Sequence, residues 1–311
     1  MSEYKTNLST KLGSLTLKNP VMPASGAYDY FENNANLFPM SELGAVMVKS
    51  VHFEVRQGNP PPRVTEAQSG MINAVGIPSM GMERFLKEQH LARYAELGAP
   101  MVLSISGSTP EQYGAAVSIL ADDARVSALE LNLSCPNVGT GLPFSSDPAL
   151  LERTMKGVRP HTKLPIFVKL SPNVADIRPI VKAAQESGAD ALVIANTYRA
   201  MKIDIRKQRS VLGRVSGGFS GPAIKPMTLA LVYQAYEVAD IPIIGCGGIS
   251  VWQDAIEYFL AGATAIQVGC INFTEPLAMP NIIRGVDNYL QDMGYESLSQ
   301  IIGLAHQNNN E

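Results

Sequence analysis

Eight short apolar runs are the feature of this 311-residue sequence that most restricts its possible folds. Each run ends in small or polar residues, and most are separated by segments with helical spacing. Continuous hydrophobicity is typical of strands in a parallel sheet that is covered on both faces. The runs cover residues 20–23, 45–49, 101–105, 128–133, 166–170, 191–195, 242–246 and 264–268.

Helical signals between the runs complete an alternating pattern. Residues 109–112 (Thr-Pro-Glu-Gln) combine an N-cap, a proline at the first helical position and a capping-box glutamine, which predicts a helix to about Leu120. Further helices are expected at 174–184, at 222–238, at 251–259 and at 275–291. Eight strands alternating with helices predict an α/β fold, a (β/α)8 TIM barrel.

Three segments lie outside this alternation. Residues 8–18 alternate apolar and polar side chains around Gly13, which predicts a hairpin covering the N-terminal end of the barrel. The connections 50–79 and 197–221 are longer than the scaffold needs and follow strands, so we expect functional loops on the C-terminal face. We expect one domain over residues 1–311, with an inserted hairpin at 197–221 (strands 202–205 and 210–212) over the active site. The basic residues between 199 and 214 indicate either a solvated hairpin or attraction of an anionic ligand or partner.

Composition excludes several classes of function. A net charge of -3 gives no reason to expect nucleic acid or an anionic membrane as a partner. No segment approaches the roughly 18 uninterrupted apolar residues of a membrane span, and the first residues lack a secretory apolar region, so we expect a cytoplasmic protein. Three cysteines without a Cys-x-x-Cys pair and four scattered histidines predict neither a disulfide scaffold nor a metal site.

Polar residues cluster where the fourth run ends. Asn132, Cys135 and Asn137 stand there, and Pro136 stops the strand. In a barrel this edge is the catalytic one. Cys135 is either a small buried hydrophobe, as cysteines usually are, or a thiol that faces a ligand. The two amides beside it favour the second interpretation.

Glycines follow the last two runs, at Gly247, Gly248 and Gly269. Such turns let backbone N–H groups approach a phosphate, although they could also merely relieve backbone strain. Their pairing favours phosphate, and the turn at 220–221 adds a third small, polar site. Because no dinucleotide-binding or Walker glycine motif is present, a redox enzyme with this sequence would bind flavin mononucleotide (FMN) more plausibly than a dinucleotide.

Lys49 and Lys169 end two of the runs. A lysine at the end of an apolar strand needs an anion or an acceptor to offset its desolvation. Three interpretations stay open for each lysine: a Schiff-base nucleophile, an electrostatic stabiliser of a reduced cofactor, or a side chain that extends its charged end to solvent.

Several motifs occur together along most of the chain. They are PASG (23–26), SGMINAVG (69–76), NLSCPN (132–137), VKLSPN (168–173), SGPAIKP (220–226) and GGI (247–249). With these motifs the chain resembles, over roughly residues 10–305, the class 1 dihydroorotate dehydrogenases. Among these it is most similar to the B type, the catalytic subunit of the NAD-linked enzyme.

The resemblance implies an FMN-dependent oxidation of dihydroorotate to orotate in pyrimidine biosynthesis. Cys135 would take the proton from C5, and hydride would pass from C6 to FMN. The implied substrate-binding residues are Lys49, Asn73, Gly76, Ile77, Asn132, Asn137, Asn196 and Thr197. The implied cofactor-binding residues are Ala24, Ser25, Lys49, Asn132, Lys169, Ile194, Ser220, Gly221, Gly247, Gly248, Gly269 and Cys270, the last in place of the usual threonine.

The resemblance also implies a homodimer and allows a heterotetramer with an iron–sulfur flavoprotein subunit, through which FAD, a 2Fe–2S cluster and NAD would take part. Three alternatives stay open. The chain could be a dihydropyrimidine dehydrogenase subunit acting on uracil or thymine, although the basic segment and Asn137 favour a substrate with a carboxylate. It could be a Schiff-base aldolase or a sugar-phosphate isomerase using Lys169. It could also be a catalytically silent barrel that only binds a ligand or a partner.

Overall fold

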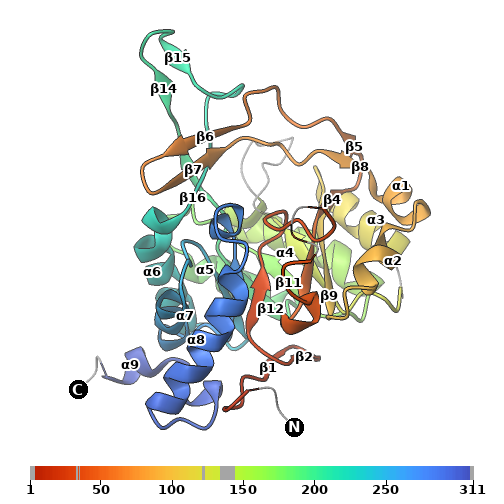
Figure 1. The fold of residues 1–311 in the computed structure, drawn as a ribbon. Coiled ribbons are helices and arrows are strands. Elements are labelled where there is room, and N and C mark those ends of the chain that lie inside the picture. The colour runs from red at the N-terminus through yellow and green to blue at the C-terminus, as the bar shows by residue number, and fades with distance from the viewer. Residues whose placement is uncertain (1–3, 33, 35, 121–122, 134–143, 309–311) are drawn as a thin grey trace.

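Eight parallel strands form one curved sheet in the computed structural model, which describes residues 4–32, 34, 36–120, 123–133 and 144–308 (Figure 1). Beside the two end strands, the Gly44 N–H donates to the Val21 carbonyl at 2.9 Å, so the sheet nearly closes. The predicted (β/α)8 barrel and its eight strands are therefore confirmed. In spatial order the strands are β3 (Val21–Pro23), β18 (Ala265–Val268), β17 (Ile243–Cys246), β12 (Ala191–Ile194), β11 (Ile166–Lys169), β10 (Ala128–Asn132), β9 (Met101–Ser106) and β4 (Val46–His52).

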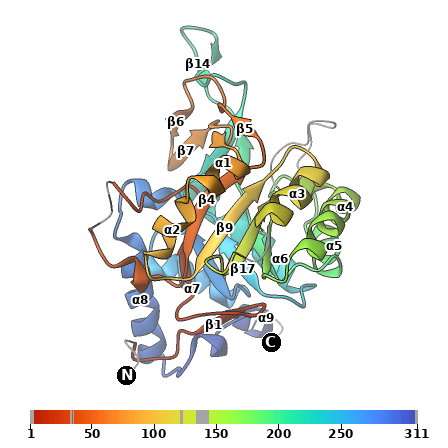
Figure 2. The same cartoon turned by 90° about the vertical axis from the view of Figure 1, so that its right-hand side faces the viewer.

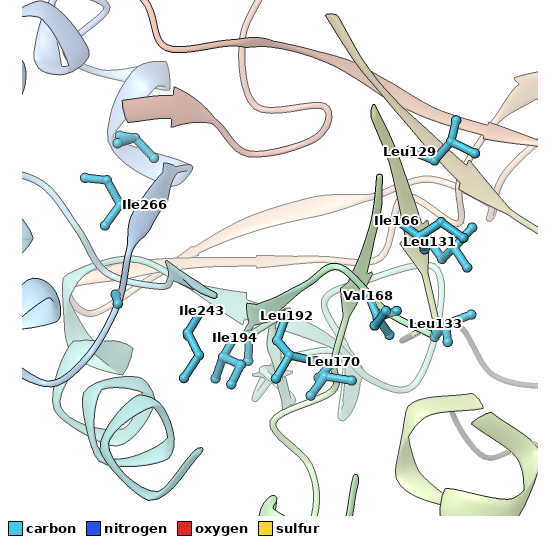
Figure 3. Packing of buried hydrophobic residues seen from close by; sticks show 14 of the residues in the cluster. Leu129, Leu131, Leu133, Ile166, Val168, Leu170, Leu192, Ile194, Ile243 and Ile266 are labelled. Atoms are coloured by element: carbon cyan, nitrogen blue, oxygen red, sulfur yellow. The ribbon is translucent and has the colours of Figure 1, made fainter. Parts of the chain in front are cut away.

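Strand residues alternate between two buried faces. Leu129 and Leu131 of β10 belong to the hydrophobic cluster that packs against the helices (Figure 3). Ala128 of the same strand and Phe167 of β11 belong to a second cluster, inside the barrel. All four side chains are fully buried. The strands are continuously apolar because each of their faces meets a different core.

Helices cover the outside of the barrel, and α3 (Pro110–Leu120), α4 (Pro148–Val158) and α5 (Arg178–Glu186) lie side by side (Figure 2). Within the described part of the chain, no helix combines the length and hydropathy that a membrane crossing requires. The other helices are α1 (Met82–Lys87), α2 (His90–Ala95), α6 (Lys225–Tyr236), α7 (Trp252–Leu260), α8 (Ala278–Asp292) and α9 (Leu304–Asn308).

Three of the predicted helices begin later than expected. The structure starts α6 at Lys225 and α8 at Ala278, where 222 and 275 were predicted, and the largest difference is at α5. The apolar spacing placed the start of a helix at residue 174, but α5 begins at Arg178. Pro179 explains the difference, because a proline fits the first turn of a helix and not its interior. The Asp176 side chain accepts the Arg178 backbone N–H at 3.0 Å at this start.

The N-terminal hairpin is confirmed. Strands β1 (Thr10–Leu12) and β2 (Leu15–Leu17) pair antiparallel around Gly13, whose φ is 62°. Leu12 and Leu17 are fully buried and join the cluster inside the barrel, which includes Met47 and Phe167. The hairpin therefore closes the N-terminal end of the barrel.

The two long connections meet above the opposite end of the barrel (Figure 1). They build one sheet, in the order β13 (Tyr198–Ala200), β16 (Gly217–Ser220), β7 (Gly70–Asn73) and β6 (Val64–Ala67). The expected hairpin within 197–221 is formed by β14 (Ile203–Asp204) and β15 (Arg209–Ser210), and it extends away from the barrel. A further pair joins β5 (Val55–Arg56) to β8 (Ser79–Met80).

We expect Leu12→Ala to lower the free energy of unfolding by about 2 to 5 kcal/mol, because it leaves a cavity where the hairpin closes the barrel. The measurement is urea unfolding followed by circular dichroism. Leu37→Ala is the control, since Leu37 is 46% exposed and its loss is expected to change stability by no more than about 0.5 kcal/mol. Equal effects of the two variants would show that the hairpin does not close the core.

Candidate active site

A cavity of about 350 Å³ opens at the C-terminal ends of the barrel strands. This volume lies within the range of small-molecule sites, about 300 to 1,000 Å³. Most of the residues predicted from the sequence line it, although they come from distant parts of the chain. They are Ala24, Ser25, Lys49, Asn73, Gly76, Ile77, Asn132, Lys169, Asn196, Thr197, Ser220, Gly221, Gly247, Gly248, Gly269 and Cys270.

Three predicted residues are not among those that line the cavity. The Ile194 side chain is fully buried in the core between the strands and the helices, and its neighbour Ala195 lines the cavity instead. Cys135 and Asn137 lie outside the described residues. The chain leaves β10 at Asn132, so Cys135 follows three residues beyond the end of that strand.

A larger space of about 900 Å³ lies near the N-terminal segment. It is more open, it is lined by residues 4–9, Lys18 and residues around Tyr295, and it contains none of the predicted site residues. The smaller cavity is the candidate active site, because the polar residues converge there.

Amide side chains at one part of the cavity are held by hydrogen bonds. Asn73 donates from Nδ2 to the Gly218 carbonyl at 3.3 Å, across the β7–β16 pairing. Asn196 donates from Nδ2 to Asn132 Oδ1 at 3.3 Å, and its own Oδ1 accepts the Thr197 N–H at 2.7 Å. The site therefore presents oriented donors and acceptors, as a planar, amide-rich ring would require.

Lys49 reaches this cavity because β4 is irregular. The pairing of β4 with β9 shifts between Val48 and Val51, so both valines join the outer core. Lys49 lines the cavity, and its stem passes the Gly26 Cα, where an added Cβ would lie 3.4 Å from Lys49 Cγ. Burial and then the charge of Arg63 lower the pKa of Lys49 below its ordinary value.

Small residues form another part of the wall, after β17 and β18. Gly248 has a φ of 70°, and an added Cβ would lie 2.7 Å from the Lys225 backbone nitrogen, so only glycine fits there. At Gly269 an added Cβ would meet only Ala24 Cβ, at 3.6 Å. The fold has room for a side chain at Gly269, and the lack of one leaves the backbone open to a ligand.

Two described cysteines, Cys246 and Cys270, line the cavity. Burial raises the pKa of Cys246 and of Cys270 above the ordinary thiol value. A general base needs a pKa near the working pH. Neither of these two residues is therefore suited to that role.

Lys169 lies at the end of β11 with 5% of its surface exposed. Its Nζ donates to Gln267 Oε1 at 2.8 Å and lies 3.8 Å from Glu130 Oε2. Burial opposes the charge, but the electrostatic influence of Cys246 and then of Glu130 outweighs burial, and the pKa of Lys169 is raised. A Schiff-base nucleophile requires a neutral amine. The structure thus disfavours the aldolase interpretation and favours electrostatic stabilisation of a ligand.

The sequence analysis missed four polar residues: Ser50, Ser104, Glu130 and Gln267. Ser50 lines the cavity, and the other three are fully buried beneath it. Their positions in the sequence could have revealed them, because each of these polar residues stands in or just after an apolar run. Polar groups at such positions need partners, since unpaired burial is unfavourable.

The basic segment of the inserted hairpin does not contribute to the cavity wall. Arg199, Lys202, Arg206, Lys207, Arg209 and Arg214 are exposed, and none of them lines the cavity. Lys202 donates from Nζ to the Glu66 carbonyl at 2.7 Å. These observations favour the solvated hairpin over attraction of a ligand into the cavity.

Comparison with known proteins agrees with this geometry. Residues 7–290 match the protein family described as "Dihydroorotate dehydrogenase". Three relatives carry the name "Dihydroorotate dehydrogenase B (NAD(+)), catalytic subunit". The relative from Desulforamulus reducens is 42% identical over 97% of this chain and 99% of its own length. The relative from Carboxydothermus hydrogenoformans is 44% identical over 96% of this chain and 98% of its own length. The relative from Bacteroides thetaiotaomicron is 42% identical over 96% of this chain and 98% of its own length. The chain therefore belongs to the dihydroorotate dehydrogenase family.

Proposed function

We propose that this protein oxidises dihydroorotate to orotate in pyrimidine biosynthesis, with FMN bound in the cavity and Cys135 as the general base. The observation that carries the proposal is the composition of one cavity wall. Oriented amides, a partly exposed lysine, a buried charged lysine and ligand-accessible glycine turns all line the same 350 Å³ space. Family membership agrees with this assignment.

The residues present fit FMN. The turns at Gly247, Gly248 and Gly269, with the 220–221 turn, would hold its phosphate through backbone N–H groups. Ala24, Ser25 and Lys169 would hold the ring, with the backbone at Ile194. When bound, FMN supplies the hydride acceptor of the oxidation. The Lys169 charge would stabilise negative charge that develops beside it.

Residues at the other part of the wall would bind the pyrimidine. Lys49 pairs with the carboxylate in this proposal, and the amides of Asn73, Asn132 and Asn196 bond the ring with Thr197. The backbone of Gly76 and Ile77 lies in the same wall. Gly76 has a φ of 78°, and an added Cβ would lie 2.7 Å from Asn59 Cγ, so the wall requires glycine there. Asn137, outside the described residues, would complete the set.

Cys135 would remove the proton from C5. A thiol does this only when its pKa falls toward the ambient pH, which nearby cations promote. Among the described residues that line the cavity, Lys49 and Lys169 carry the positive charge. The position of Cys135, just beyond the strand that carries Asn132, supports its access to the same ligand.

We also propose that a separate subunit passes the electrons to NAD. The relatives are named catalytic subunits of an NAD(+) enzyme. This chain has three cysteines, and an iron–sulfur cluster is usually held by four. An iron–sulfur flavoprotein with FAD and a 2Fe–2S cluster would supply the missing path in a heterotetramer built on a homodimer of this chain.

We expect the wild-type protein to be yellow and its flavin absorbance to be bleached by dihydroorotate without oxygen. Cys135→Ala should retain FMN but be reduced at least ~100-fold more slowly, because a positioned base contributes about that much. The measurement is stopped-flow absorbance, and dithionite reduction is the control for a competent flavin. A wild type that dihydroorotate does not bleach would contradict the proposed function. Near-normal reduction of the variant would contradict the role of Cys135.

We expect Lys49→Met to weaken orotate binding about 10- to 100-fold, the usual effect of losing a charged hydrogen bond, and to leave uracil binding unchanged. Uracil lacks the carboxylate that Lys49 would pair with. In the wild type, orotate affinity should fall as the pH rises through the pKa of Lys49. The affinity should begin to fall at a pH below the ordinary lysine pKa, because burial lowers the pKa of Lys49. Titration of flavin fluorescence at several pH values measures both effects. Equal losses for uracil and orotate would contradict the pairing.

A further inference from the structure

A carboxylate lies inside the barrel, beneath the cavity. Glu130 is fully buried on β10, two residues before Asn132. Its Oε1 accepts the Ser104 hydroxyl at 2.9 Å, and its Oε2 accepts Gln267 Nε2 at 2.7 Å. Lys169 Nζ lies 3.8 Å from the same Oε2. Glu130 itself does not line the cavity, so its partners must carry any influence on a ligand.

One branch from Glu130 leads to Lys169 through Gln267. Lys169 donates to Gln267 Oε1 at 2.8 Å, and Gln267 donates to Glu130 at 2.7 Å. An ammonium can only donate and a carboxylate can only accept. The Gln267 amide is therefore held in a single orientation. Glu130 Oε2 lies 3.8 Å from Lys169 Nζ, so the carboxylate supplies negative charge that holds the ammonium.

A second branch leads from Glu130 to the amides of the cavity. Ser104 Oγ lies 2.8 Å from Ser50 Oγ, which accepts Asn132 Nδ2 at 3.1 Å. Asn132 Oδ1 accepts Asn196 Nδ2 at 3.3 Å, and Asn196 Oδ1 accepts the Thr197 N–H at 2.7 Å. The result is an unbroken series of five hydrogen bonds between the Thr197 backbone and the Glu130 carboxylate.

The two ends of this series determine its direction. A backbone N–H can only donate, and a carboxylate can only accept. Ser104 must donate to Glu130, so Ser50 donates to Ser104, and Ser50 in turn accepts from Asn132. Each amide thus presents its nitrogen toward Glu130 and its oxygen toward Thr197. The backbone N–H at one end and the carboxylate at the other fix the orientation of both amides, so this orientation does not depend on how hydrogen atoms are placed.

We propose that Glu130 is a positioning residue, whose carboxylate directs the hydrogen bonds that orient Asn132 and Asn196 and holds the Lys169 ammonium toward the cavity. The inference rests on the proposed function, because it assigns the two amides to the pyrimidine and Lys169 to FMN. Glu130 touches neither ligand. Through its hydrogen bonds, Glu130 determines which donor and acceptor atoms face the pyrimidine and which charge faces FMN.

Glu130→Gln tests the proposal with a side chain of the same shape. Lys169 still donates to the Gln267 carbonyl, so Gln267 still turns its amide toward residue 130. The new side chain must give its carbonyl to Gln267 and its own amide to Ser104. The Ser104 hydroxyl must then accept and turn its proton away from residue 130, so the direction that the carboxylate imposed on the series is lost. We expect the dissociation constants of orotate for the FMN-bound protein and of FMN for the apoprotein both to rise about tenfold or more.

Ser104→Ala separates the two branches. It removes the link to Ser50 and leaves the contacts among Glu130, Gln267 and Lys169. We expect weaker orotate binding, again by about tenfold, with FMN affinity unchanged. Because Ser104 is a small, uncharged residue, this variant keeps the proposal testable if Glu130→Gln does not fold.

Asp287→Asn is the matched control. Asp287 is also buried, at 7% exposed, and its carboxylate accepts hydrogen bonds from Lys5 and Thr6, far from the cavity. We expect lower thermal stability with both ligand affinities unchanged. A merely structural role of Glu130 would give the same result for Glu130→Gln.

The outcomes separate the hypotheses. Wild-type affinity for orotate in both Glu130→Gln and Ser104→Ala would overturn the directing role. Wild-type affinity for FMN in Glu130→Gln would overturn the role toward Lys169. A wild-type protein that binds FMN but not orotate would overturn the proposed substrate instead, and FMN titration of Glu130→Gln would then still decide the Lys169 branch.

Discussion

The burial of both faces of every barrel strand is the constraint on which the structure depends. Successive side chains must satisfy different surroundings, the helices on one side and the barrel interior on the other. On β10, Leu129 and Leu131 face the helices, whereas Ala128, Glu130 and Asn132 alternate with them. This alternation places a carboxylate in the interior and an amide in the cavity wall. A shift of one residue would exchange the two faces.

The polarity of the barrel interior changes along the barrel axis. Apolar residues and the N-terminal hairpin fill one end, where Leu12 and Leu17 pack with Phe167. Polar residues replace them toward the other end, where Glu130, Gln267 and Lys169 share their hydrogen bonds. A buried charge is tolerated only when it is paired and hydrogen-bonded. The polar layer meets this condition, and it joins the packed core to a cavity that can bind a charged ligand.

The two inserted connections give this cavity its upper wall. Strand β7 carries Asn73, and it pairs with β16, which ends at Ser220. Segments about 145 residues apart in the chain are thus held together at one ligand site. The tip of the inserted hairpin extends away from the barrel (Figure 1). Its basic residues therefore lie on the solvent-exposed surface and not in the cavity wall.

The sequence alone determined the eight strands and the hairpin, and its resemblance to a known family pointed to most of the cavity wall. Apolar period and turn residues are local signals, and the ends of parallel strands must meet at one edge. The start of α5 was misplaced because the apolar spacing outweighed Pro179. Only the tertiary structure brought Ser104, Glu130 and Gln267 together, from three strands of the barrel. No local pattern specifies which inward residues meet across a barrel, because strand stagger and closure decide those contacts.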